Sequence, residues 1–203
     1  EEGMKDHDTQ LAYRGWEIVS KNISEITRIT QNILYSAKKQ KPAHKAAKPS
    51  NIARQTGQLF SEKASSMGVQ MLLELNPNIP EMKVDAAGIS RMLGNLIWNA
   101  LQACQKDTRK TKHLIFVRVD YYDDYHFMYE VEDNAQGMGK KIKEDLFKEF
   151  FTSKGDSGNG LGLMVVDRIV NHHKGKIEVL SKKGAGSLFR VIFRRQDKAM
   201  EIE

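Results

Sequence analysis

Hydrophobic residues recur at alternating spacings of three and four along the first 41 residues. This heptad pattern predicts one long helix over about residues 6–41, because such spacings place apolar side chains in one stripe. The stripe consists of Trp16, Val19, Ile23, Ile26, Thr30, Ile33 and Ala37. A lone helix of this kind is marginally stable in water, so we expect it to pair with another helix or with a second copy of the chain.

A second helical stripe follows Asp85, which is suited to cap a helix N-terminus. Its apolar positions are Ile89, Met92, Leu93, Leu96, Ile97, Ala100, Leu101 and Cys104. Shorter helices are predicted over 51–67, 141–147 and 160–173, and strands over 69–75, 114–122, 126–132, 176–181 and 187–195. Helices interleaved with a mostly antiparallel sheet predict an α+β fold in two layers, with the helices on one face of the sheet.

Pro42 and Pro49 frame a basic segment that we interpret as a flexible linker. We therefore expect two domains, a helical one over residues 1–45 and a folded one over 46–203. Lysines are concentrated around this linker, at Lys38, Lys39, Lys41, Lys45 and Lys48. A basic cluster can meet nucleic acid or an acidic protein surface, but no recognition motif accompanies it, so no nucleic-acid partner is predicted.

Composition narrows the class of protein. The chain has 40% hydrophobic and 29% charged residues and a net charge of +6, which is ordinary for a globular protein. No apolar run approaches the ~20 residues that span a bilayer, so we expect no membrane segment and a cytoplasmic location. The single cysteine, Cys104, excludes an internal disulfide, favours a reducing compartment and falls on an apolar stripe, as expected for a core thiol.

Three carboxamides follow one face of the second stripe. Asn95 and Asn99 are four residues apart and therefore share a helix face, and Gln102 extends it. Carboxamide oxygens are hard donors that suit Mg²⁺, so these residues could hold a metal or a ligand. The alternative is a solvated polar face.

Glycines accompany polar residues at three further places. Asp133 follows a strand, could accept a hydrogen bond from an amine such as adenine N6, and precedes Gly137; the alternative is a simple turn. Phenylalanines at 147, 150 and 151 flank a polar stretch, 152–159, typical of a mobile lid, whose Lys154 could meet phosphate. Glycines at 158, 160 and 162 introduce a helix whose N-terminus favours an anion, and those at 184 and 186 indicate a hairpin before Ser187.

In this order, the segments resemble the Bergerat (GHKL) ATP-binding fold of gyrase, the Hsp90 chaperones, MutL and histidine kinases, over about residues 50–195. LGNLIWNALQAC is similar to the kinase N-box, EDNAQGM to the first glycine box, LFKEFF to the F-box and GNGLGL to the second glycine box. The ATPases carry a Glu that orients a hydrolytic water where this chain has Asn95, which cannot act as a general base. The chain therefore resembles sensor histidine kinases most, and NALQAC those of the nitrogen-regulator type.

The resemblance implies a role for each matching residue. Asn99 would bind Mg²⁺, with Asn95 and Gln102 beside the phosphates of ATP or ADP. Asp133 would accept from the adenine amine, with a water bridged to Ser187, and Gly137 and Met138 would lie against the base. Further nucleotide contacts would come from the lid and from the N-terminus of the next helix, through Thr152, Ser153, Lys154, Gly160, Leu161, Gly162 and Leu163. Asn95, Asn99 and Lys154 would form the catalytic set.

The resemblance also implies transfer of the γ-phosphoryl group to a histidine outside this chain and then to a response-regulator aspartate. The chain would form a homodimer through its first helix, the second arm of a hairpin. His7 does not continue the acceptor pattern, so we expect no autophosphorylation. Ala135 replaces the first glycine of the D-x-G-x-G pattern, and a positive φ there would cost about 1–2 kcal/mol. The alternatives are a GHKL ATPase, an anti-sigma-type serine kinase, or a non-catalytic nucleotide-binding dimerisation module.

Overall fold

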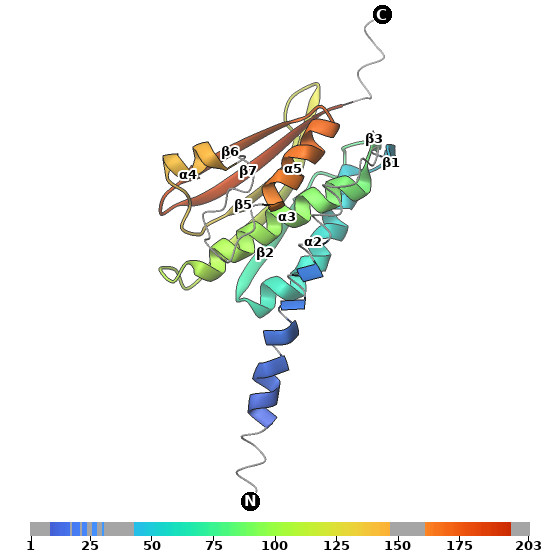
Figure 1. Ribbon diagram of the computed structural model, residues 1–203. Helices are drawn as coiled ribbons and strands as arrows, with labels where there is room; N and C mark the ends of the chain where they lie inside the picture. Colours follow the sequence, from blue (N-terminus) through green and yellow to red (C-terminus); the bar gives the residue numbers. More distant parts are fainter. Residues whose placement is uncertain are drawn as a thin grey trace, which may run out of the picture. The chain divides into compact units, whose positions relative to one another are not determined.

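The computed structural model describes residues 9–16, 18–20, 22–23, 26–27, 30, 43–146 and 161–195. The chain divides into two compact units, Glu1–Gln40 and Lys41–Glu203. Figure 1 traces both along the sequence. The described ranges contain no helix that is both long enough and apolar enough to cross a membrane.

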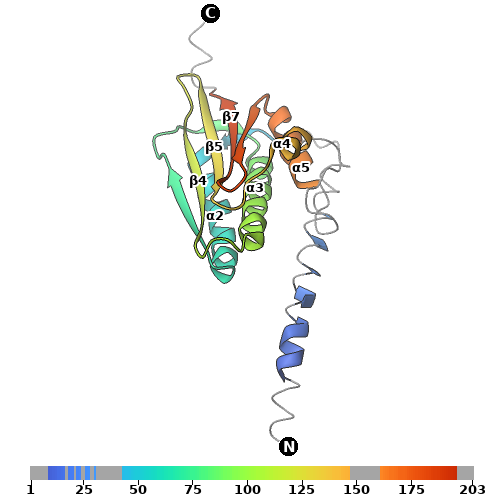
Figure 2. The same cartoon turned by 90° about the vertical axis from the view of Figure 1, so that its left-hand side faces the viewer.

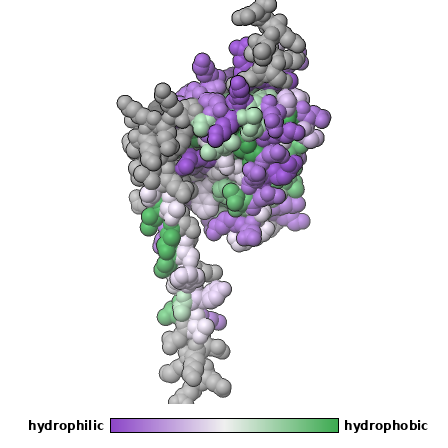
Figure 3. Space-filling model, turned by 90° about the vertical axis from the view of Figure 1, so that its right-hand side faces the viewer, coloured by the Kyte–Doolittle hydropathy of each residue, from purple (hydrophilic) through white to green (hydrophobic). Residues whose placement is uncertain are grey.

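The N-terminal unit is helical at every residue described between 9 and 30, as the heptad pattern predicts. Its large apolar side chains are exposed, from 47% for Val19 to 70% for Leu11. Figure 3 shows hydrophobic residues along this unit. The rest of the predicted helix, including Ile33 and Ala37, lies outside the described residues. The expected pairing with a second helix stays a prediction.

The second unit contains a five-stranded sheet with strand order β2-β4-β5-β7-β6. These strands are β2 (Val69–Leu75), β4 (His113–Tyr121), β5 (His126–Asp133), β6 (Lys176–Lys182) and β7 (Gly186–Arg194). Only the β2–β4 pair is parallel. The helices are α2 (Pro49–Ser66), α3 (Ala86–Lys106), α4 (Lys140–Asp145) and α5 (Leu161–His172). Because α2, α3 and α5 cover one face of the sheet (Figures 1 and 2), the predicted two-layer α+β class is confirmed.

Helix α3 begins where its sequence predicts. The Asp85 carboxylate accepts from the backbone N–H of Gly88 at 3.1 Å and so satisfies one free donor of the first turn. The apolar stripe is buried almost completely, with Leu93, Ile97 and Leu101 at 0% exposure. This burial is the main source of stability for the helix and fixes which of its faces is turned to the sheet.

The segment interpreted as a linker contains a short strand. Residues Lys45–Ala47 form β1, which pairs antiparallel with β3 (Met82–Val84). Three-residue strands are too short for a period of two to stand out in a sequence, so this pairing was missed. Pro49 then occupies the first position of α2, where its missing N–H costs nothing.

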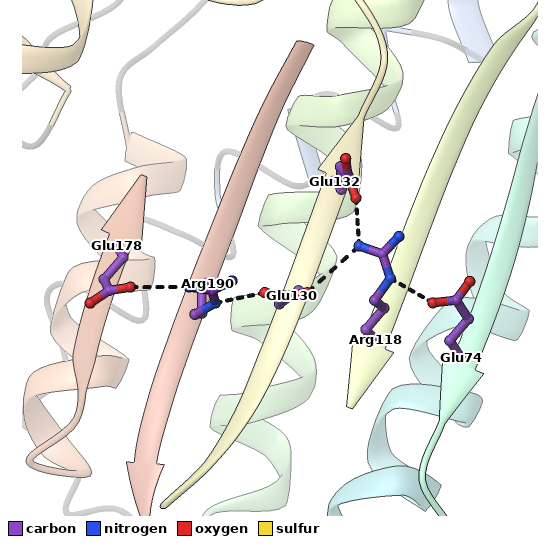
Figure 4. A network of polar contacts seen from close by, with 6 residues as sticks. All are labelled: Glu74, Arg118, Glu130, Glu132, Glu178 and Arg190. Atoms are coloured by element: carbon purple, nitrogen blue, oxygen red, sulfur yellow. Dashed lines mark hydrogen bonds and ion pairs between the residues drawn. The ribbon is translucent and has the colours of Figure 1, made fainter. Parts of the chain in front are cut away.

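The face of the sheet opposite the helices carries a row of alternating charges, which we call the charge row: Glu74, Arg118, Glu130, Arg190 and Glu178 (Figure 4). Each residue lies directly opposite the next across neighbouring strands. Arg118 Nε lies 2.5 Å from Glu74, and Arg190 Nε lies 2.6 Å from Glu130. Glu130, at the centre, is only 4% exposed.

Candidate functional site

Asp133 ends β5 on the helix-facing side of the sheet and is 6% exposed. Its Oδ1 accepts from the backbone N–H of Ala135 at 2.9 Å. Burial raises the pKa of Asp133 to about 6, and hydrogen bonds from the backbone N–H groups of Ala135 and Ser187 oppose that shift. Burying this carboxylate in its charged form costs folding free energy. Groups with strongly shifted pKa values occur often at binding and catalytic sites, so Asp133 is a candidate hydrogen-bond acceptor for a ligand.

The β6–β7 hairpin lies against the loop that follows Asp133. The N–H of Gly184 donates to the carbonyl of Gln136 at 2.6 Å. A Cβ on Gly137 (φ 63°) would overlap the carbonyl oxygen of Lys182, and a Cβ on Gly186 (φ 110°) would overlap that of Asp133. Both positions therefore need glycine, for conformation and for space.

Ala135 does not adopt the strained conformation that its place in the glycine pattern suggested. Within the described residues, Lys174 is the only non-glycine residue with positive φ. Ala135 is fully buried and its N–H binds Asp133. The expected backbone penalty at Ala135 was wrong, because Gly137 alone makes the left-handed step in this loop.

Helix α3 brings the carboxamides toward α5. Asn95 is 6% exposed, and its Nδ2 donates to the carbonyl of Arg91 at 2.9 Å. Its Oδ1 would lie only 3.2 Å from a Cβ on Gly162, which stands in the first turn of α5. The structure therefore brings Asn95 and Gly162 close together.

The same helix also reaches Asp133. The pKa of the buried Cys104 thiol is raised to about 12, first by desolvation and next by the charge of Asp133. Cys104 is the expected core thiol, 1% exposed. Asn99 and Gln102, both half-buried, stand on α3 between Asn95 and Cys104. One helix thus connects the Asn95–Gly162 contact with the Asp133 end of the site.

Part of the predicted site cannot be placed. Thr152, Ser153, Lys154 and Gly160 lie outside the described residues, as do the three phenylalanines expected to flank the lid. Leu161 is described only as the start of α5, and Leu163 is half-buried in that helix. The roles of these residues stay predictions.

Sequence reasoning missed Ser181. Its Oγ accepts from the N–H of Met138 at 2.8 Å and lies 3.0 Å from Ser187 Oγ. It thereby joins the loop after Asp133 to the hairpin. The available signal was the register, because Ser181, Ser187 and Asp133 lie opposite one another on three neighbouring strands.

His173 directly follows α5, and two hydrogen bonds hold its imidazole ring. Its Nδ1–H donates to the carbonyl of Ile169 at 2.8 Å, and its Nε2 accepts from the N–H of Asp85 at 3.1 Å. Burial lowers the pKa of His173, and nearby His44 lowers it further. A small hollow lined by His44, His173 and Phe193 lies there, at the opposite end of α5 from Gly162.

The described residues contain no cluster of three or more His, Cys, Asp or Glu side chains that could hold a metal. A divalent ion at α3 would therefore take carboxamide oxygens plus phosphate and water oxygens, which is how Mg²⁺ is commonly bound. A side chain at Gly162 would crowd Asn95, because a Cβ there would lie 3.2 Å from Asn95 Oδ1.

A comparison with known protein families identifies the family of the segment that forms this site. Residues 84–197 match the family described as histidine kinase-, DNA gyrase B- and HSP90-like ATPases. The chain belongs to this family. The match begins just before α3 and ends just after β7, so it includes every element that contributes to the site.

The curated relatives are sensor kinases. The chain is 27% identical to sporulation kinase E of Bacillus subtilis over 92% of its own length and 24% of the relative's. It is 28% identical to the sensor histidine kinase ZraS of Escherichia coli over 85% of its own length and 36% of the relative's. The chain thus spans about a quarter to a third of these relatives.

A solved structure shows the same fold. Full-length ShkA in complex with AMPPNP matches with a TM-score of 0.71 at 18% identity, over 86% of this chain and 36% of ShkA.

Proposed function

We propose that this chain is the ATP-binding core of a sensor histidine kinase. The observation that carries the proposal is that α3 holds Asn95 beside Gly162 of α5 and packs against β5, which ends at the buried acceptor Asp133. Family membership supports it. The solved structure of full-length ShkA, which shares the fold, is a complex with AMPPNP.

In this proposal the adenine lies at Asp133 and the phosphates lie toward the N-terminus of α5. The Asp133 carboxylate accepts from the base amine, and the close-packed loop at Gly137 and Met138 lies against the ring. The N–H groups of the first turn of α5, together with the helix dipole, stabilise negative charge. Asn99 would hold Mg²⁺, which would supply positive charge beside the phosphates.

The acceptor of the phosphoryl group is proposed to be a histidine outside this chain, with a response-regulator aspartate next in line. Asn95 favours this over hydrolysis, since a carboxamide cannot take a proton from water. Its Nδ2 donates to the Arg91 carbonyl, and its Oδ1 is the atom that lies nearest to a Cβ on Gly162.

Calorimetric titration of the full chain with ATP, with and without Mg²⁺, tests the proposal. We expect Mg²⁺-dependent binding in the wild-type protein and loss of at least about tenfold in affinity in Asn99→Ala, as is typical when a metal ligand or its support is removed. Asn51→Ala is the matched control, because Asn51 is exposed on α2 and its side chain bonds only Arg54 in the described contacts. Absence of ATP binding by the wild-type chain would refute the proposal.

Incubation with γ-labelled ATP separates the rival activities. We expect no label on the purified chain and label on a receiver domain only when a histidine-bearing partner is added. Steady release of phosphate, abolished by Asn99→Ala, would instead identify an ATPase.

We further propose that the N-terminal helix forms a homodimer. Trp16, Ile23 and Ile26 on its heptad stripe are each more than half exposed in the single chain, and such a stripe stabilises a helix only by burial. Sedimentation equilibrium should report a dimer for the wild-type chain and a monomer for Ile23→Glu. Exposed Ile18→Glu, outside the stripe, should stay dimeric.

A further inference from the structure

Ser181 stands at the centre of a hydrogen-bonded group beside the proposed base. It lies on β6, directly opposite Ser187 on β7, and Ser187 lies directly opposite Asp133 on β5. Ser181 Oγ lies 2.8 Å from the Met138 nitrogen, 2.9 Å from the Gly186 carbonyl oxygen and 3.0 Å from Ser187 Oγ. One hydroxyl thus touches both the loop after Asp133 and the start of β7.

Counting the available hydrogens fixes the direction of each hydrogen bond in this group. A serine hydroxyl donates one hydrogen and accepts through two lone pairs. The Met138 N–H can only donate, and the Gly186 carbonyl can only accept, so Ser181 accepts from Met138 and donates to Gly186. All three contacts are hydrogen bonds only if Ser187 donates its own hydrogen to Ser181.

The lone pairs of Ser187 Oγ then remain for the side of Asp133. Ser187 is 7% exposed and Asp133 is 6% exposed, so little water competes there. A carboxylate is itself an acceptor only. The two side chains together present acceptors and no donor.

We propose that Ser181 is a specificity-determining residue, because it turns Ser187 into an acceptor and so makes this end of the site select a base with an exocyclic amine. Adenine carries such an amine, whereas hypoxanthine has a carbonyl oxygen in its place. An oxygen facing two acceptors is left unpaired in a buried place, which a site rejects strongly. This inference rests on the proposed function, since it requires the base to lie at Asp133.

The test compares Mg·ATP with Mg·ITP, whose base is hypoxanthine, by calorimetry on the full chain. The measured quantity is the ratio of the two dissociation constants. In Ser181→Ala, Ser187 is free to turn its hydrogen toward the base, and we expect the preference for ATP to fall about tenfold, the effect of one hydrogen bond gained and one lost. Ser181→Thr keeps the hydroxyl and should restore the wild-type ratio.

A second variant and a control accompany this comparison. Ser187→Ala removes the proposed acceptor itself and should lower the ratio similarly, which keeps the test decisive if Ser181→Ala does not fold. Ser66→Ala should leave the ratio unchanged, because that exposed hydroxyl bonds only the Lys63 carbonyl in the described contacts.

The outcomes separate this inference from the proposed function. If the wild-type chain binds neither nucleotide, the proposed function fails. If it binds ATP and Ser181→Ala loses affinity for both nucleotides equally, Ser181 merely supports the Met138 loop and the inference alone is overturned.

Discussion

The two faces of the five-stranded sheet are held by different interactions. The face under the helices consists of side chains such as Ile115, Val117 and Val191, all at 0% exposure. The opposite face carries the charge row, whose end member Glu74 has a side chain 53% exposed. Burial of each apolar side chain contributes roughly 1.5–3 kcal/mol, whereas exposed ion pairs contribute about 0–1 kcal/mol. The apolar face therefore supplies most of the stability.

The charge row supplies something that apolar burial does not. A slip of two residues between β2 and β4 or between β6 and β7 would keep every apolar side chain on its own face, but it would move Glu74 off Arg118 or Glu178 off Arg190. The row thus discriminates among registers that the core alone would accept. Asp133 needs this register, because its position opposite Ser187 builds the site.

Gly186 packs closely against the Asp133 carbonyl at the edge of the apolar face, and a substitution at Gly186 would disrupt this contact. Gly186→Ala combines a positive φ with overlap of the Asp133 carbonyl, so we expect a loss of about 3–5 kcal/mol in the free energy of unfolding. Urea denaturation measures it. Gly139→Ala is the control: φ is −78° and nothing lies within 4 Å of the added Cβ, so the change should stay within about 1 kcal/mol. A wild-type midpoint for Gly186→Ala would contradict the contact.

Asp133 is a charge buried on the apolar side, and its effect on stability depends on pH. Because its pKa is raised from 3.8 to about 6 in the folded chain, the folded state holds the proton more tightly than the unfolded state. The wild-type free energy of unfolding should therefore fall by roughly 3 kcal/mol as pH rises from about 4 to 6.

Asp133→Asn should lack that decrease. Urea midpoints across the same pH range compare the two proteins, and parallel curves would contradict the raised pKa. The variant should also lose ATP binding, because an amide cannot present acceptors alone to the base amine. If Asp133→Asn is more stable than the wild type near pH 6 but no longer binds ATP, then the charge of Asp133 lowers stability and is needed for binding.

The contribution of each charged residue to stability should decrease from the centre of the charge row to its edge. Glu130→Gln leaves Arg190 without its 2.6 Å carboxylate partner at a site 4% exposed, and we expect a loss of about 1–3 kcal/mol. Glu74→Gln, at the exposed edge, should change stability by less than about 1 kcal/mol. Guanidinium denaturation of both variants measures the gradient, and equal effects would contradict it.

The apolar face of the sheet and the helix that covers it could be predicted from the sequence, but the charge row could not. The stripe from Ile89 to Cys104 repeats over about four turns, so its helix and buried side could be predicted. Opposite charges such as Arg118 and Glu130 become neighbours only once the strand register is known, and single strands do not reveal it.

The site divides in the same way. Asp133, Asn95 and Gly162 lie in motifs whose order is informative, so they could be predicted from the sequence. Ser181 lies in a strand with no pattern of its own and is placed by pairing with β7. Ala135 was misjudged because the sequence does not show which residue of the loop makes the left-handed step; Gly137 makes it.

Helix α5 covers the apolar face of the sheet. Just after its end, Lys174 has a strained backbone conformation. Lys174 adopts φ 52° after the helix, a position where glycine is usual. Lys174→Gly should raise the free energy of unfolding by about 0.5–1 kcal/mol, because the relief of strain exceeds the added freedom of the unfolded chain. Lys63→Gly, in the last turn of α2, should have the opposite sign and lower stability by about 0.5–1 kcal/mol. Thermal denaturation of both variants tests this, and the same sign for both would show that backbone conformation at Lys174 has no part in the stability of the apolar face.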